Sequence, residues 1–233
     1  TITTLIVKSR NKNVATLVNF GCHPESLGRE NRLITADFPG YLTKRLEKEL
    51  GGAALFVNGL LGGMVSINKE YFKIKDKSFE RAEETGNVLA ERVLDSIASA
   101  KHIKNFSLKI QRKTVAIPLT NPGFQAARLL NLIPISGETF DQGRVLTEVG
   151  IITFGEMKII LVPGEMTPGL GERIKALMPS ARTAVFGLTN DEIGYILPSE
   201  DFDLPLYKYE RTMSLGQSAG NVIYQALKEL AAQ

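Results

Sequence analysis

The chain has 233 residues, of which 43% are apolar and 23% charged, as in an ordinary globular protein. The 28 Lys and Arg residues are interleaved with 25 Asp and Glu, so the net charge of +3 does not indicate a nucleic-acid partner. No apolar run reaches the roughly 18 residues of a transmembrane helix, and the single cysteine, Cys22, excludes an internal disulfide. We therefore expect a soluble protein held together by its core, and the composition leaves open whether it is cytoplasmic or secreted.

The first half of the chain predicts a hairpin, two helices and a third strand. Residues 2–7 and 14–20 are β-rich runs on either side of a polar turn. Residues 37–50 have apolar residues at a helical period, and two glycines follow them. The short apolar run 53–57 is typical of a buried central strand. Residues 78–98 are the longest helix signal.

The second half of the chain continues the alternation of strands and helices. Phe106, Leu108 and Ile110 alternate with polar residues, and 114–117 continues in the same extended style. The remaining predicted elements are a helix over 126–132 within a long excursion, a hairpin formed by 146–154 and 158–162, a helix over 169–178, a strand over 183–188 and a closing helix over 214–231. No repeat or linker interrupts this order. The sequence thus predicts one layered α/β/α domain with a mixed sheet over residues 1–233.

Polar side chains collect directly after four of the predicted strands, each time in a glycine-containing turn. They are His23, Asn58 with Gly59 and Ser66, Glu165, and Asn190 with Tyr195. In open α/β sheets, ligands bind outside the carboxyl ends of the strands, where such turns converge. We therefore expect a ligand site there, with Asn58, Gly59 and Asn190 contacting the substrate.

Each of these residues also has a structural interpretation. His23 could be hydrogen-bonded within its turn, Glu165 could favour a helix dipole, and Tyr195 could belong to the core. The glycine loop 59–63 lacks the Gly-Lys-Ser/Thr ending of a P-loop, which argues against nucleotide binding. His102 lies among lysines, and we expect it to be exposed to solvent.

Two nucleophiles remain as alternatives. Cys22 precedes His23, although no cysteine-hydrolase signature surrounds it. Thr1 begins the chain next to a predicted strand, as an N-terminal nucleophile would. The absence of an initiator methionine also suggests that the chain was processed or starts inside a longer protein.

Six segments together resemble the second half of the catalytic domain of the neutral, or non-lysosomal, ceramidase family. They occur in family order and cover most of the chain: VNFGCHPES at 18–26, NRLITADFPGY at 31–41, ALFVNGLLGGMVS at 54–66, VPGEMT at 162–167, GLTNDEIGY at 187–195 and YKYE at 207–210. The first contains a histidine motif, and the last three contain the glutamate and tyrosine motifs.

The resemblance implies a zinc-dependent hydrolase of an N-acyl amide bond, acting on a small N-acyl or lipid-like compound of the sphingolipid kind. It implies His23, Glu165 and Tyr195 as zinc ligands, and Tyr195, Tyr209 and Ser66 as catalytic residues. In such enzymes zinc polarises the amide carbonyl and activates the attacking water.

Two departures from the family pattern are visible. The family's upstream histidine motif has no counterpart here, and GGMVS at 62–66 replaces Gly-Asp-Val-Ser. The resemblance then implies that an amino-terminal portion is a separate chain or was removed. The alternative is a metal-free or inactive fragment or subunit with a binding or structural role.

Overall fold

The computed structural model describes residues 1–63, 65–103, 107–133, 139–179 and 182–233. The chain divides into two compact units. The first unit comprises Thr1–Gly59 and Val65–His102, and the second comprises Leu60–Met64 and Ile103–Gln233. Our expectation of a single domain over 1–233 stays a prediction beside this division.

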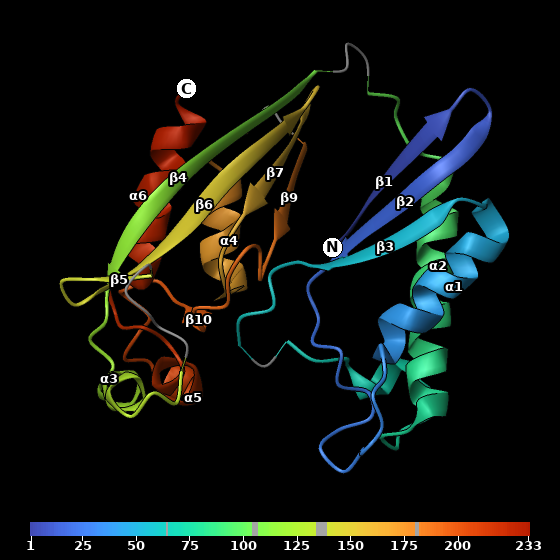
Figure 1. Cartoon of the computed structure of the whole chain (residues 1–233). Coiled ribbons are helices and arrows are strands. Elements are labelled where there is room, and N and C mark those ends of the chain that lie inside the picture. The colour runs from blue at the N-terminus through green and yellow to red at the C-terminus, as the bar shows by residue number, and fades with distance from the viewer. Residues whose placement is uncertain (64, 104–106, 134–138, 180–181) are drawn as a thin grey trace. The chain divides into compact units, whose positions relative to one another are not determined.

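A three-stranded mixed sheet and two helices form the first unit (Figure 1). Its elements are β1 (Ile2–Ser9), β2 (Lys12–Phe20), α1 (Asp37–Leu50), β3 (Ala53–Asn58), the 3-10 turn η1 (Lys69–Tyr71) and α2 (Phe79–Ile97). The sheet order is β1-β2-β3, with β1 antiparallel and β3 parallel to β2. The predicted hairpin and the helix over 37–50 are confirmed.

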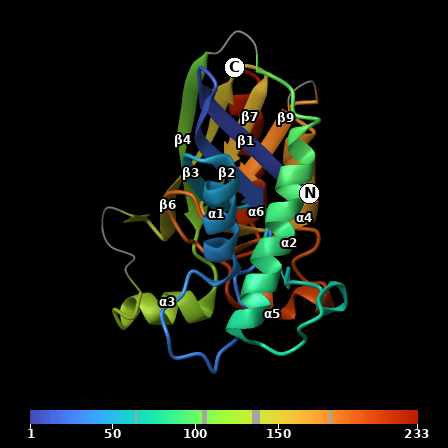
Figure 2. The same ribbon diagram turned by 90° about the vertical axis from the view of Figure 1, so that its right-hand side faces the viewer.

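Helix α1 places its apolar stripe between the sheet and α2. Phe38, Leu42 and Leu46 recur at intervals of four residues, and all three are fully buried. The two helices lie side by side in both views (Figure 1 and Figure 2). Gly86 of α2 permits this close packing, because a Cβ there would lie 2.6 Å from the backbone oxygen of Phe38. The side chain of Ser78 caps α2 by accepting a hydrogen bond from the backbone of Arg81 at 3.2 Å.

The second unit contains a larger mixed sheet of order β4-β6-β7-β9, with β5 added on β6. The strands are β4 (Leu108–Pro118), β5 (Phe140–Asp141), β6 (Arg144–Phe154), β7 (Met157–Leu161) and β9 (Arg182–Phe186). Neighbouring strands pair antiparallel except β9, which is parallel to β7. The predicted hairpin across Gly155 is confirmed. Phe106, part of our strand prediction, lies outside the described residues.

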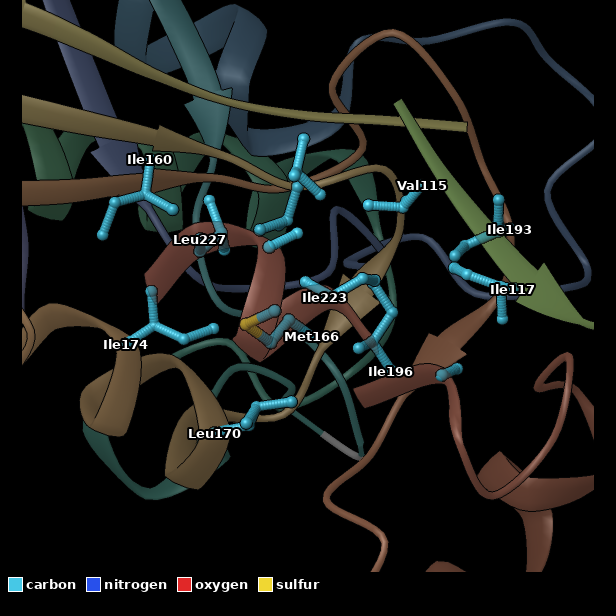
Figure 3. Packing of buried hydrophobic residues seen from close by; sticks show 14 of the residues in the cluster. Val115, Ile117, Ile160, Met166, Leu170, Ile174, Ile193, Ile196, Ile223 and Leu227 are labelled. Atoms are coloured by element: carbon cyan, nitrogen blue, oxygen red, sulfur yellow. The ribbon is translucent and has the colours of Figure 1, made fainter. Parts of the chain in front are cut away.

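Among its described residues, the second unit also contains four helices, of which α4 and α6 pack against this sheet, and two further short strands. The helices are α3 (Pro122–Leu129), α4 (Pro168–Lys175), α5 (Lys208–Thr212), α6 (Ala219–Ala231) and the 3-10 turn η2 (Pro205–Tyr207). The short strands are β8 (Glu165–Met166) and β10 (Tyr195–Ile196), which pair with each other in parallel. Figure 3 shows Met166, Leu170, Ile196 and Ile223 in the buried cluster that α4, α6 and the strands share.

Mixed sheets with helices packed against them confirm the predicted α/β class. Three local expectations are wrong. The apolar run 53–57 predicts a buried central strand, but β3 is the last strand in the order β1-β2-β3. Helices cover only one face of this sheet, so Leu55 on the other face is 49% exposed. The predicted helix over 126–132 begins earlier, at Pro122, because Asn121 caps it. The closing helix begins at Ala219, since Leu215 accepts backbone hydrogen bonds from Thr120 and Asn121 instead.

Candidate functional site

Two of the predicted site residues, Glu165 and Tyr195, meet in the second unit. They are Cα partners in the parallel pair of β8 and β10. The backbone N–H of Glu165 donates to Gly194 at 3.0 Å, and that of Tyr195 donates to Met213 at 2.9 Å. The pair is therefore fixed on one side by the turn before β10 and on the other by the end of α5.

The glycines of these two motifs have a structural reason. Gly194 has a φ of +84°, and a Cβ there would lie 2.0 Å from the backbone oxygen of Met213. A Cβ on Gly164 would lie 2.5 Å from the backbone oxygen of Gly194. Only glycine lets the Pro-Gly-Glu turn and the turn before Tyr195 approach so closely.

The phenol of Tyr195 is tied to the carboxylate of Glu165. Burial, the negative charge of Glu165 and the hydrogen bond that Tyr195 donates to it raise the pKa of the phenol above its ordinary value. The ring of Tyr209 stands edge-on to that of Tyr195, with centroids 6.0 Å apart and planes at 69°. Tyr209 is 59% exposed, so a ligand can reach its side chain.

A glycine turn and a buried glutamate complete this part of the second unit. Gly62 donates its N–H to the backbone oxygen of Met166 at 2.9 Å. A Cβ on Gly62 would lie 2.3 Å from the backbone oxygen of Glu165. A Cβ on Gly63 would lie 3.8 Å from Oε1 of Glu210. Glu210 is only 2% exposed, and its Oε2 has no hydrogen-bond partner among the described residues.

His23 and Ser66 belong to the first unit. The chain leaves β2 at Phe20 and reaches His23, whose backbone N–H donates to Val65 at 3.0 Å. Ser66 follows directly, and its hydroxyl donates a hydrogen bond to the carboxylate of Glu25. The structure thus brings the segments of His23 and Ser66 together, and it adds Glu25 as the partner of the serine hydroxyl.

Asn58 and Gly59 lie at the end of β3, beside the same segment. Gly59 donates its N–H to the backbone of Phe20 at 3.0 Å. The side-chain oxygen of Asn58 is buried without a hydrogen-bond partner among the described residues. Their role in binding substrate stays a prediction.

The thiol of Cys22 is unsuited to nucleophilic chemistry. Cys22 is 3% exposed, and burial together with the charges of Glu25 and Asp37 raises its pKa to about 12. A thiol must ionise to attack a carbonyl. The geometry therefore argues against the cysteine alternative. His102 is exposed, as expected.

Asn190 points to a different part of the second unit. It adopts a φ of +67°, and its side-chain amide donates to Glu148 at 3.3 Å. Glu148 also faces Arg112 at 3.8 Å. Substrate binding by Asn190 stays a prediction.

Sequence reasoning did not single out Glu210, Tyr207 or Glu25 as site residues. Tyr207 lies 3.9 Å from the Cβ position of Gly63, and burial, Asp201 and Glu210 raise its pKa. Two of the three belong to the YKYE segment at 207–210. That segment was the available signal, but its pattern alone does not say which side chains turn inward.

The described part of the chain contains no group of three or more His, Cys, Asp or Glu placed to hold a metal ion. Tyrosine is a further oxygen donor beside these types. The carboxylate of Glu165 and the phenol of Tyr195 are adjacent oxygen donors, and carboxylate oxygen is among the ligand types that zinc takes. None of the helices over the described residues combines the length and apolar character that crossing a bilayer requires.

Comparison with known proteins shows a ceramidase-like fold. The structure of neutral ceramidase from Pseudomonas aeruginosa matches 99% of this chain and 46% of its own length, with a TM-score of 0.73 and 16% identity. A structure of a ceramidase complexed with C2 matches 99% of this chain and 47% of its own, with a TM-score of 0.74 and 17% identity. The chain thus spans less than half the length of these structures. No family model and no curated protein matches it.

Proposed function

We propose that this chain forms part of a zinc-dependent, ceramidase-like hydrolase of an N-acyl amide bond. The observation that carries the proposal is the Glu165–Tyr195 pair, in which a carboxylate and a phenol are held side by side on paired strands. The ceramidase-like fold over 99% of the chain supports it.

We propose His23, Glu165 and Tyr195 as zinc ligands, and of these Glu165 and Tyr195 are neighbours on the paired strands β8 and β10. All three side chains are half-buried, so they are accessible to an ion while being held by their surroundings. Nitrogen and oxygen donors suit zinc, although tyrosine is an uncommon ligand. Because the structural neighbours are about twice as long as this chain, we propose that a further portion of the protein, or a separate chain, supplies the remaining ligand.

Other side chains orient the substrate in this proposal. When bound, zinc supplies Lewis-acid polarisation of a carbonyl group and a lowered pKa for water. Tyr209 presents an exposed phenol beside Tyr195, and we assign it to donate a hydrogen bond to the oxygen of the amide carbonyl. We also propose a catalytic role for Ser66, whose hydroxyl donates to the carboxylate of Glu25 within the first unit. The proposed substrate is a small N-acyl or lipid-like amide.

Metal content is the first test. The purified chain is analysed by elemental mass spectrometry before and after chelation, together with His23→Ala and His102→Ala. We expect about one zinc per chain in the unmodified protein and in His102→Ala, and a loss in His23→Ala. His102 is the matched control because it is the second histidine of the chain and is exposed.

Hydrolysis of a fluorescent N-acyl sphingosine, followed with and without chelator, is the second test. Zinc-dependent release of the fatty acid supports the proposal. Because the proposal assigns one ligand to a further portion, the assay is repeated with that portion present. A well-folded protein that then holds no zinc and releases no fatty acid contradicts the proposal and supports the alternative of a metal-free binding or structural module.

A further inference from the structure

Glu210 is a buried carboxylate that the assignments above do not use. It lies in α5, is 2% exposed, and its Oε2 has neither solvent contact nor a hydrogen-bond partner among the described residues. An ionised group taken out of water is costly unless it is paired or faces a cation. Natural proteins seldom keep such a group without a reason.

The surroundings of Glu210 connect it to the Glu165–Tyr195 pair. Helix α5 ends at Thr212, and the next residue, Met213, accepts the backbone hydrogen bond of Tyr195 at 2.9 Å. On its other side, Glu210 faces the turn at Gly63, next to the turn residue Gly62 that binds the backbone of β8. The charge of Glu210 also acts on the phenols of Tyr195 and Tyr207.

The cations next to Glu210 in the sequence do not neutralise it. Arg211 faces Asp203 at 3.3 Å, and Lys208 is exposed to solvent. The single hydroxyl proton of Tyr195 is already directed to Glu165. The carboxylates of Glu165 and Glu210 therefore both act on the phenol of Tyr195, and only Glu165 receives its hydrogen bond.

We propose that Glu210 is a positioning residue of the cation site, a second carboxylate whose charge stabilises a zinc ion held by Glu165 and Tyr195. This inference rests on the proposed function and deepens it. Glu210 acts through the field at the site and through the placement of α5 and the glycine turn, and it is not itself a ligand. Partners behind the ligands of a metal typically change its affinity 10- to 100-fold.

The test is the zinc affinity of the chain, measured by calorimetric titration with a zinc salt. Glu210→Gln keeps the shape of the side chain and removes its charge, and we expect zinc affinity to fall about 10- to 100-fold. Glu210→Asp keeps the charge and should recover most of the loss. Glu229→Gln is the control, because Glu229 is an exposed glutamate on α6 with its own partner, Lys113. An unchanged affinity in Glu210→Gln would overturn the inference while leaving the proposed function standing.

Thermal unfolding of the metal-free chain distinguishes this role from a structural one by the direction in which the Tm of Glu210→Gln changes. Relief of a buried carboxylate without a partner should raise the Tm of Glu210→Gln by about 2–4 °C. A merely structural glutamate would give a lower Tm in the same variant, and that result would overturn the inference. If the unmodified chain and Glu229→Gln bind no zinc at all, the metal of the proposed function fails, and Glu210 loses its assigned role with it.

Discussion

Glu165 and Tyr195 stand side by side on two short parallel strands although 30 positions separate them along the chain, and the phenol of Tyr195 donates its hydrogen bond to the carboxylate of Glu165. This contact orients the carboxylate without a positive charge. It leaves both side chains only half-buried. The pair is thus held in place and still accessible to a ligand.

Removing the phenol oxygen should weaken metal binding more than it weakens the fold. We expect Tyr195→Phe to lower zinc affinity at least about 10-fold, because a ligand and the partner of Glu165 are lost together. The free energy of unfolding should fall by only about 0.5–1.5 kcal/mol, the usual contribution of one hydrogen bond. Calorimetric titration and urea unfolding measure the two effects.

Tyr224→Phe is the matched control for that variant. Tyr224 lies on α6, and the guanidinium carbon of Arg173 is 5.4 Å from the centroid of its ring. Tyr224 has no part in the proposed site. Equal losses of zinc affinity in both tyrosine variants would contradict the assignment of Tyr195.

The buried thiol of Cys22 predicts a stability that declines at alkaline pH. Its pKa is raised from 9.0 to about 12 in the folded chain, so the unfolded chain releases the proton first. The contribution of Cys22 is therefore complete below pH 9 and is lost as the pH rises toward 12. We expect the free energy of unfolding to fall by about 1 kcal/mol per pH unit in that window.

Cys22→Ala should remove this part of the pH dependence while leaving amide hydrolysis intact. Urea unfolding at pH 7, 9 and 10.5 measures the first effect, and the fluorescent substrate measures the second. Loss of hydrolysis in a folded Cys22→Ala chain would revive the cysteine nucleophile.

Close backbone packing at Gly62 predicts that alanine destabilises the fold at this position, whereas alanine at Gly169 stabilises it. Gly62→Ala places a methyl group 2.3 Å from the backbone oxygen of Glu165, so the turn and β8 must separate. We expect a loss of about 1–3 kcal/mol in the free energy of unfolding. Gly169 has nothing within 4 Å of its Cβ position and lies in helix α4, so Gly169→Ala should instead stabilise by about 0.5–1 kcal/mol. A pair of chemical unfolding curves decides whether the signs differ.

The side chain of Asn121 has two functions that substitutions can separate: it caps helix α3 and it binds the end of helix α5. Its side-chain oxygen accepts hydrogen bonds from Gly123 at 2.8 Å and Phe124 at 3.3 Å, which caps α3. Its amide donates to Thr212 at 2.9 Å and Ser214 at 2.8 Å, which ties the start of α3 to the end of α5. Asn121→Asp keeps the acceptor, whereas Asn121→Ala removes both functions.

We expect Asn121→Ala to cost about 1–2 kcal/mol of unfolding free energy, with Asn121→Asp losing protection only around α5. Amide hydrogen exchange of the two helices reports each effect separately. Exchange that speeds up equally in α3 and α5 of Asn121→Asp would contradict the separation.

Expectations that depend on neighbouring residues along the chain agree well with the structure. The helix predicted over 37–50 has those bounds, because its apolar period, Asp37 and the two following glycines all act within a few residues. The two hairpins are equally local. The closing helix was expected five residues too early, because the packing of Leu215 against distant Thr120 decides where it starts.

The sequence by itself determined the α/β class, the order of the longer strands and helices, and the glycine turns in which His23, Glu165 and Tyr195 lie. These features follow from the period of apolar residues and from turn chemistry, both of which are local. Only the tertiary structure decided that Glu165 pairs with Tyr195, that Cys22 is kept protonated and that Glu210 turns inward. Parallel pairing and burial arise from contacts between segments far apart in the chain, and no local pattern encodes which segments will meet.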